Sequence, residues 1–393
     1  MRSFRRFVLP AGALIAGCAA TALAVPAASA ASALAPANAT AATAASDRTG
    51  TAPAVFVQTD NPAGNQVDVY ARAADGTLSL VHTYPTGGLG GALTGSVVDH
   101  LASQGSLTYD AAHHLLYAVN AGSDTVSVFA VEGTGLSLRQ TVGSGGTFPV
   151  SVAVHGDVVY VLNAEAGGSV QGFRVVGGRL VAPHGWNRQL GLDADAAPQF
   201  THTPGQVGFT DDGRQLLVTT KAAGNDVYVY RLAADGAPST SVTINALPGA
   251  VPFAFVSTGA RQIALVEAGT NTVATFRVGG DGTLDQLGTL ATGQAATCWI
   301  AATGDLLFAS NAGSADETGV RLGAGGSLTG LGETATDPGT VDASATPDGH
   351  YLYVQTGGNG VVDAYRIGAG GALTALGSVT VAGAAGGEGI AAD

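Results

Sequence analysis

A unit of four short strands recurs along most of this chain, and it is clearest near the C-terminal end. The strands of that unit are rich in Val and Tyr and lack a helical apolar period. Pro, Asp and Gly separate them at positions typical of tight turns. The unit predicts an all-β fold. Its expected strands are Val341–Thr346, Tyr351–Gln355, Val361–Ile367 and Leu373–Val379.

Seven such units can be aligned on their second strands. They follow one another at an interval typical of four-stranded propeller blades, which predicts a seven-bladed β-propeller with four antiparallel strands per blade. Asp-Gly and Gly-Gly pairs mark many of the hairpins into the fourth strands. The expected second strands are Val55–Gln58, Leu116–Asn120, Val159–Asn163, Leu216–Thr220, Ile263–Glu267, Leu306–Ser310 and Tyr351–Gln355.

The first unit has no strand upstream of Val55, whereas the extreme C-terminus has one that no other unit needs. We therefore expect Glu388–Asp393 to complete the first blade beside Val55–Gln58. Pairing the two ends in this way closes the ring and removes exposed strand edges.

Two connections are longer than the others, near Gly87–Ser103 and near Trp186–Thr203. Insertions of this kind are accommodated in loops, so both segments are expected to form a lid or rim. Trp186 is a rare aromatic residue in the second insertion, and we expect it to cover the central channel.

The N-terminal residues have the pattern of an export signal. Three arginines precede the apolar run Phe7–Ala16, and Ala28-Ser29-Ala30 has the A-x-A form of a cleavage site. The stretch ending in Cys18 also fits a lipoprotein box, so lipid anchoring stays open as a second interpretation. The expected domains are a signal peptide at 1–30, a disordered Ala/Thr-rich linker at 31–51 and the propeller at 52–393 of a secreted protein.

The charge balance restricts the partners. The formal net charge is −13, and Lys221 is the one lysine in the sequence. Such a chain lacks the cationic surface that neutralises phosphates, so nucleic acid is not an expected partner. We expect a monomer without a membrane span in its mature part, without a cofactor or metal, and with a small molecule or glycan as its ligand.

In a propeller, loops from all blades meet on one face around the central channel. On this alignment Glu165 or Glu267 could act as general base on water, and Lys221 could stabilise an oxyanion. The alternative interpretation of the asparagines is that they serve the turns, because Asn tolerates left-handed backbone. The predicted catalytic residues are Lys221, Glu267 and Glu165, and the predicted ligand-binding residues are Asn120, Asn163, His202, Asn311 and Glu388.

The turns Asp211-Asp212-Gly213 and Pro347-Asp348-Gly349, the latter within a P-D-G-x-x-L-Y-V stretch, resemble those of the lactonase family of seven-bladed propellers. That family includes propeller-type 6-phosphogluconolactonase and carboxymuconate-cyclising enzyme, and YVTN-type propellers share much of the pattern. The resemblance implies a lactone hydrolase or cycloisomerase.

At the positions where the family usually has its catalytic groups, this chain has other residues. Phe148 stands where the family often has His, Thr203-Pro204-Gly205-Gln206 lacks an Arg, and Lys221 replaces a Glu. Two hypotheses follow. One is an exported enzyme acting on a lactone or related small acid at the channel mouth. The other is a non-catalytic secreted propeller that binds a glycan, peptide or small ligand.

Overall fold

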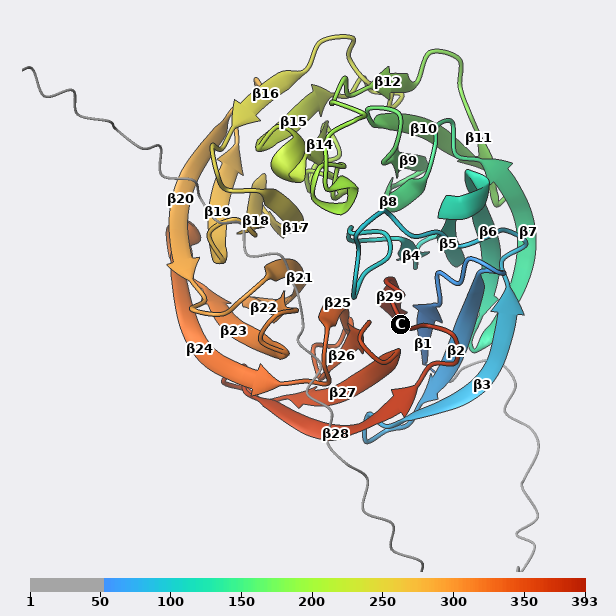
Figure 1. Cartoon of the computed structure of the whole chain (residues 1–393), viewed down its shortest axis with the longest axis vertical. Helices are drawn as coiled ribbons and strands as arrows, with labels where there is room; N and C mark the ends of the chain where they lie inside the picture. Colours follow the sequence, from blue (N-terminus) through green and yellow to red (C-terminus); the bar gives the residue numbers. More distant parts are fainter. Residues whose placement is uncertain (1–52) are drawn as a thin grey trace, which may run out of the picture. The chain divides into compact units, whose positions relative to one another are not determined.

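The computed structural model describes residues 53–393, which form seven antiparallel sheets arranged in a ring (Figure 1). The expected signal peptide and linker lie outside the described residues. The predicted seven-bladed propeller is therefore confirmed, with its four-stranded blades and the C-terminal strand in the first of them.

The first four blades have the following strands. Blade 1 contains β29 (Ile390–Ala392), β1 (Ala54–Gln58), β2 (Gln66–Arg72) and β3 (Leu78–Pro85). Blade 2 contains β4 (Leu107–Asp110), β5 (Leu115–Asn120), β6 (Thr125–Glu132) and β7 (Gly135–Gly143). Blade 3 contains β8 (Pro149–His155), β9 (Val158–Asn163), β10 (Ser169–Val176) and β11 (Arg179–Val181), and β12 (Asn187–Gln189) also pairs with β10. Blade 4 contains β13 (Val207–Phe209), β14 (Gln215–Thr219), β15 (Asp226–Arg231) and β16 (Thr243–Ala246).

The remaining blades follow the same order. Blade 5 contains β17 (Pro252–Gly259), β18 (Gln262–Glu267), β19 (Thr272–Val278) and β20 (Leu284–Ala291). Blade 6 contains β21 (Thr297–Thr303), β22 (Leu306–Asn311), β23 (Asp316–Leu322) and β24 (Leu328–Ala335). Blade 7 contains β25 (Thr340–Ala345), β26 (Tyr351–Thr356), β27 (Val361–Ile367) and β28 (Leu373–Thr380). Short 3-10 turns are η1 (Ala121–Ser123), η2 (Gln199–Thr201), η3 (Lys221–Ala223) and η4 (Ala324–Gly326).

The second strands read as continuous apolar runs because both of their faces are covered by neighbouring blades. Every residue of β5 and of β26 is buried. The outermost strands show the opposite pattern, and β28 exposes about half of its residues to solvent. The core is thus divided among the interfaces between adjacent blades.

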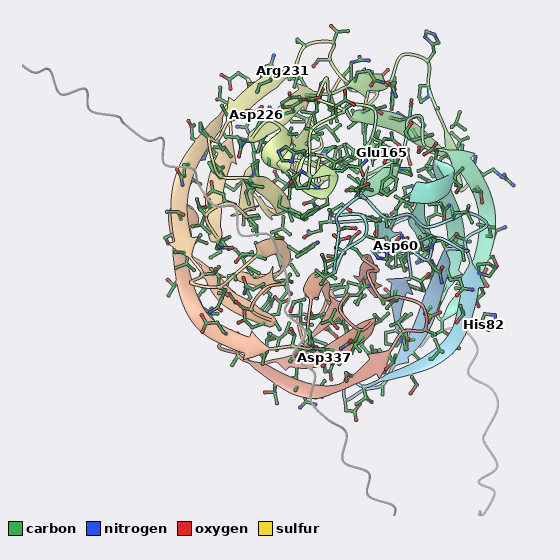
Figure 2. All side chains as sticks on the ribbon, viewed as in Figure 1. Asp60, His82, Glu165, Asp226, Arg231 and Asp337 are labelled. Carbon is green, nitrogen blue, oxygen red and sulfur yellow. The ribbon has the colours of Figure 1, made fainter. Side chains whose placement is uncertain are left out.

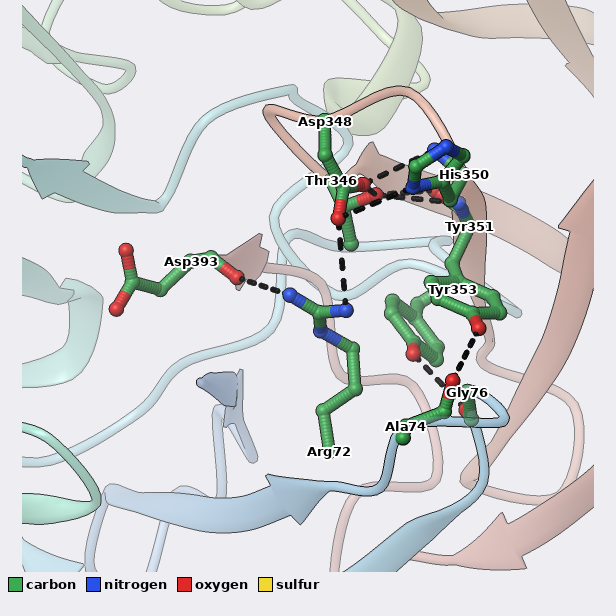
Figure 3. Close-up of polar contacts among 9 residues, drawn as sticks. All are labelled: Arg72, Ala74, Gly76, Thr346, Asp348, His350, Tyr351, Tyr353 and Asp393. Atoms are coloured by element: carbon green, nitrogen blue, oxygen red, sulfur yellow. Dashed lines mark hydrogen bonds and ion pairs between the residues drawn. The ribbon is translucent and has the colours of Figure 1, made fainter. Parts of the chain in front are cut away.

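The ring closes between blade 7 and blade 1. Phe56 of β1 lies opposite Ala391 of β29 in an antiparallel ladder. Arg72 donates a hydrogen bond to the carbonyl of Asp393 at 3.2 Å and lies over the ring of Tyr351, 5.5 Å from its centroid (Figure 3). The hydroxyl of Tyr353 donates to the Gly76 carbonyl at 2.9 Å. Backbone and side-chain contacts therefore hold the first and last blades of the propeller together.

A second type of joint links the outer strands of successive blades. In β20, β24 and β28 a bulge adds one leucine to the strand. Each leucine packs onto a glycine with positive φ in the hairpin of the next blade, and a Cβ added to that glycine would lie 2.6 to 2.7 Å from the leucine. The pairs are Leu287 with Gly326, Leu331 with Gly371, and Leu376 with Gly76.

The first insertion enters the middle of the ring, as the trace between β3 and β4 shows (Figure 1). We call residues 87–104 the plug. Trp299 of blade 6 donates its indole N–H to the Ser103 carbonyl at 2.6 Å. Ser103 in turn donates its hydroxyl to the Val150 carbonyl of blade 3 at 2.9 Å. The plug is thus fixed to blades 6 and 3, on opposite sides of the ring.

The expectation for Trp186 is wrong. Its side chain is buried and stacks on Tyr160, with ring centroids 6.3 Å apart and an interplanar angle of 5°. The cause is β12, which pairs with β10 directly after Trp186 and holds this part of the insertion against blade 3. The rest of the insertion, residues 190–203, lies beside the channel mouth, and we call it the rim loop.

Candidate functional site

A cavity of about 120 Å³ lies between the loop that follows β9 and the rim loop. Both segments lie on the channel-mouth face, because the loop joins a second strand to a third strand. The lining of the cavity combines small apolar residues with a few polar side chains. The polar residues of the lining are Glu165, Asp193, Gln199, His202 and Thr203.

Glu165 is held by a chain of two hydrogen bonds. Gln199 of the rim loop donates its amide N–H to Glu165 Oε1 at 2.8 Å, and its amide oxygen accepts the backbone N–H of Thr94 in the plug at 2.7 Å. Both bonds agree on one orientation of the Gln199 amide, because a carboxylate accepts and a backbone N–H donates. Glu165 lies beside blade 3 in Figure 2. The plug, the rim loop and blade 3 therefore meet at this carboxylate.

His202 has one ring nitrogen occupied. Its Nδ1 lies 2.8 Å from the Thr201 hydroxyl and 3.0 Å from the carbonyl oxygen of Pro198. The Thr201 hydroxyl donates to that same carbonyl at 3.1 Å, so both neighbours accept from Nδ1, and we assign the proton to Nδ1. The other nitrogen, Nε2, is then the acceptor of the neutral imidazole. Because His202 lines the cavity, its Nε2 is the nitrogen available to a water molecule or ligand there.

Thr203 connects the cavity to the buried Lys221. The ammonium donates to Thr203 Oγ1 at 3.1 Å and to the carbonyls of Ala102 and Phe200 at 2.6 and 2.7 Å. A hydroxyl that accepts from an ammonium has its own proton left to donate, and it becomes a stronger donor. Thr203 can therefore donate a hydrogen bond to a ligand oxygen in the cavity.

The burial of Lys221 is unusual for a charged side chain. It is 1% exposed, has left-handed backbone with a φ of 50°, and lies over the Phe253 ring. Burial lowers the pKa of Lys221 to about 7, and the nearby carboxylate of Asp99 opposes that shift. Asp99 belongs to the plug and accepts the backbone N–H groups of Leu101 and Ser103. The hydrogen bond from Lys221 to Ala102 ties blade 4 to the plug.

The interior next to the plug holds further carboxyl groups. Glu388 accepts the backbone N–H of Gly105 at 2.9 Å, and its own N–H donates to Asp60 at 2.7 Å. Burial raises the pKa of Asp60 to about 8 and that of Asp342 to about 7. Burial also raises the pKa of Glu388, and the charge of Asp342 raises it further. Asp60 lies toward the middle of the ring, whereas His82 lies at its outer rim (Figure 2).

The predicted catalytic residues are only partly brought together. Glu165 and His202 line one cavity, and Lys221 lies behind it, in contact with Thr203. Glu267 ends β18 and accepts the hydroxyl of Thr272 in the same blade at 2.6 Å. Within residues 53–393 no hydrogen bond or ion pair joins Lys221 to Glu267 or to Glu165. Their joint catalytic role stays a prediction.

The three predicted asparagines are fully buried and bonded within their own loops. Asn120 donates to the hydroxyls of Thr125 and Ser127 at 3.1 and 2.9 Å, at the start of the following strand. Asn163 and Asn311 make equivalent contacts after β9 and β22. These contacts agree with the interpretation that the asparagines serve the turns, but they act through side-chain bonds, since none of the three has left-handed backbone. Glu388 lies in the interior rather than at the cavity.

Position 148, where the family resemblance implies a histidine, is buried. Phe148 is 8% exposed and has a φ of 60°, and its N–H donates to Asp124 at 2.8 Å. A Cβ added to Gly91 of the plug would lie 2.7 Å from its ring. The plug therefore packs directly on this position.

The sequence reasoning missed Asp193, Gln199 and Thr203. All three lie in the second insertion, whose length was the available signal. Within the described chain no group of three or more His, Cys, Asp or Glu residues is arranged to hold a metal ion. Among the same residues no helix is long and apolar enough to cross a membrane.

The chain belongs to the lactonase family of seven-bladed β-propellers. The family described as "Lactonase, 7-bladed beta-propeller" matches residues 61–178 and 215–388, which is more than half of the chain. The rim loop lies in the unmatched stretch between these two matches. Comparison with curated proteins finds no match.

Similar solved structures share the fold. A putative 6-phosphogluconolactonase from Bacteroides uniformis is 19% identical, with a TM-score of 0.68 over 87% of this chain and 99% of that one. Another from Bacteroides fragilis is 20% identical, with a TM-score of 0.66 over 87% and 98%. The periplasmic gluconolactonase of Pseudomonas aeruginosa is 18% identical, with a TM-score of 0.66 over 87% and 99%.

Proposed function

We propose that this protein hydrolyses small lactones that carry no phosphate, in the cavity between blade 3 and the rim loop. The observation that carries the proposal is the presence of His202 and Thr203 together in the lining of that cavity. His202 offers Nε2 as a base because Nδ1–H donates to Pro198, and Thr203 offers a hydroxyl proton because Lys221 donates to its oxygen. Membership of the lactonase family supports the reaction class.

In the proposed reaction His202 Nε2 takes a proton from water as the water oxygen attacks the lactone carbonyl. The carbonyl oxygen becomes an oxyanion, which the Thr203 hydroxyl stabilises by donating a hydrogen bond. The bond from that carbon to the ring oxygen then breaks. The ring oxygen receives the proton from His202, and the product is the open hydroxy acid.

The test is hydrolysis of glucono-1,5-lactone and of simple aliphatic lactones by the purified chain, followed by acid release. We expect His202→Asn to reduce kcat by about 10²- to 10⁴-fold, the usual contribution of a general base. His184→Asn is the matched control, because His184 is exposed and does not line the cavity. Absence of turnover above the uncatalysed rate, or equal activity of the two variants, would refute the proposal.

A second candidate function is ligand binding without catalysis. It is supported by Phe148 and Lys221, which occupy family catalytic positions and are both buried under the plug or the rim loop. In that case the chain would bind the unreactive lactams of the same sugars in calorimetry, and it would leave every lactone intact.

We also propose that the chain acts after export. The leader pattern of residues 1–30 supports this proposal, with Cys18 as the alternative point of lipid attachment. N-terminal sequencing of the exported protein tests it. A mature chain that begins at Ala31 is expected, and an unprocessed N-terminus on protein found only inside the cell would contradict it.

A further inference from the structure

We propose that the cavity selects lactones that carry a positive charge, such as amino-sugar lactones, over neutral ones and against anionic ones. The proposal rests on the function proposed above and names its substrate class. It is carried by two carboxylates on the cavity wall, Glu165 and Asp193, and by the position of the one nearby lysine.

Each of the two carboxylates has one oxygen engaged and one available. Glu165 Oε1 accepts from Gln199, and Asp193 Oδ1 accepts the backbone N–H of Asp195 at 3.0 Å. Within residues 53–393 no hydrogen bond reaches Glu165 Oε2 or Asp193 Oδ2. These oxygens can accept the N–H groups of a ligand ammonium, which has donors and no acceptor.

The cationic groups near the cavity do not offset this charge. His202 is the one basic side chain in the lining, and its Nδ1–H is directed at the neutral carbonyl of Pro198. The Lys221 ammonium lies behind Thr203, and its three bonds go to Ala102, Phe200 and Thr203. Asp99 also lies near enough to act on the Lys221 charge. An anionic substituent would therefore meet two carboxylates and no free cationic donor.

The selecting residues lie where this chain departs from the matched family region. Asp193, Gln199 and His202 belong to the rim loop, between the matched stretches 61–178 and 215–388. Glu165 lies within the match, but Gln199 of the rim loop fixes its orientation. Charge selection would thus be a property that the rim loop adds to the propeller.

The experiment compares three lactones of equal ring size: glucono-1,5-lactone, its 6-phosphate, and the lactone of 2-amino-2-deoxygluconic acid. We expect kcat/KM to fall in the order cationic, neutral, anionic, with about tenfold or more between neighbours at low salt. Raising the ionic strength should narrow the ratios, because a partly exposed site is screened.

The variants Asp193→Asn and Glu165→Gln remove charge and keep the hydrogen bonds to Asp195 and Gln199. We expect each to shrink the ratio of cationic to anionic kcat/KM, and the double variant to bring it near one. The ratio is internal to each variant, so a general loss of activity does not affect it. Asp305→Asn, an exposed site in blade 6, should leave the ratio unchanged.

The outcomes separate this proposal from the one on which it rests. Hydrolysis with the phosphate fastest, or with ratios that the variants do not change, would overturn the charge selection alone. If no lactone is hydrolysed, the proposed reaction fails, and calorimetry with the three corresponding lactams tests the selection directly. Equal affinity for the three lactams would then overturn the selection as well.

Discussion

The ammonium of Lys221 donates a hydrogen bond to the carbonyl oxygen of Ala102, 119 residues earlier in the chain, at a distance of 2.6 Å. The same ammonium bonds to Phe200 of the rim loop, so one side chain of blade 4 joins both insertions. The contact between blade 4, the plug and the rim loop thus depends on a buried cation whose hydrogen-bond partners come from two separate insertions.

Replacing this cation should loosen the channel mouth. Lys221→Met leaves two buried carbonyls without their donor and Asp99 without its charge partner, so we expect a loss of about 3 kcal/mol in the free energy of unfolding. Denaturant unfolding measures the loss, and hydrogen exchange should show faster exchange in residues 99–104. Arg277→Met is the control, because Arg277 is exposed. Equal stability of the two variants would show that Lys221 does not hold the plug.

The interior carboxyls predict a stability that falls as the pH rises. Burial raises the pKa of Asp60 from 3.8 to about 8 and that of Asp342 from 3.8 to about 7. Between the pKa of the unfolded chain and the higher pKa of the folded one, each folded carboxyl keeps a proton that the unfolded chain has released. Unfolding therefore becomes easier from pH 4 toward pH 8. The pKa of Lys221, lowered by burial to about 7, gives the opposite slope above pH 7.

The fall should therefore be steepest below pH 7, and Tm should be higher at pH 5 than at pH 7. Asp342→Asn removes one of the titrating groups and should flatten the profile. Asp285→Asn, at an exposed position, serves as the comparison. A Tm that rises between pH 5 and pH 7 would contradict this assignment of the interior protons.

Loss of the C-terminal strand should destabilise the whole ring. Deletion of residues 390–393 exposes the edge of β1 and removes the carbonyl to which Arg72 donates. We expect a single unfolding transition at a clearly lower temperature. A peptide of residues 387–393 added in excess should restore part of the loss by pairing with β1. Unchanged thermal unfolding would mean that the C-terminal strand does not contribute to closure.

The glycine of the closing joint should tolerate no side chain. Gly76 has a φ of 92°, and an added Cβ would lie 2.2 Å from the ring of Tyr351. Gly76→Ala should cost about 2–4 kcal/mol through backbone strain and overpacking. Gly64→Ala is the matched control, because nothing lies within 4 Å of its added Cβ. Similar stability of both variants would be incompatible with the packing of this joint.

Most of the fold could be predicted from the sequence because its signals are local and repeated. Turn residues and apolar runs located the second strands, and the predicted strand Ile263–Glu267 differs from β18 by one residue at its start. Ring closure followed from counting first strands. Trp186 was placed wrongly because β12 is an extra strand within an insertion, which the repeat does not predict.

Fewer of the cavity residues could be predicted from the sequence. Glu165 could be proposed because a carboxylate follows a second strand, and His202 because a histidine lies in the second insertion. Both line the cavity, and their roles stay predictions. Thr203 and Gln199 were missed because their roles depend on contacts with Lys221 and Glu165, across loops that have no periodicity. The path of a plug through a ring is set by such contacts, and no local pattern encodes it.

The joint between Leu376 and Gly76 has a consequence for how the chain could be cut and rejoined. It repeats the geometry of Leu331 with Gly371 and of Leu287 with Gly326, although it connects the last blade to the first. The outer wall therefore carries the same contact at its closure as between blades that follow directly in sequence. A circular permutant with its new ends in another outer hairpin should assemble the same ring.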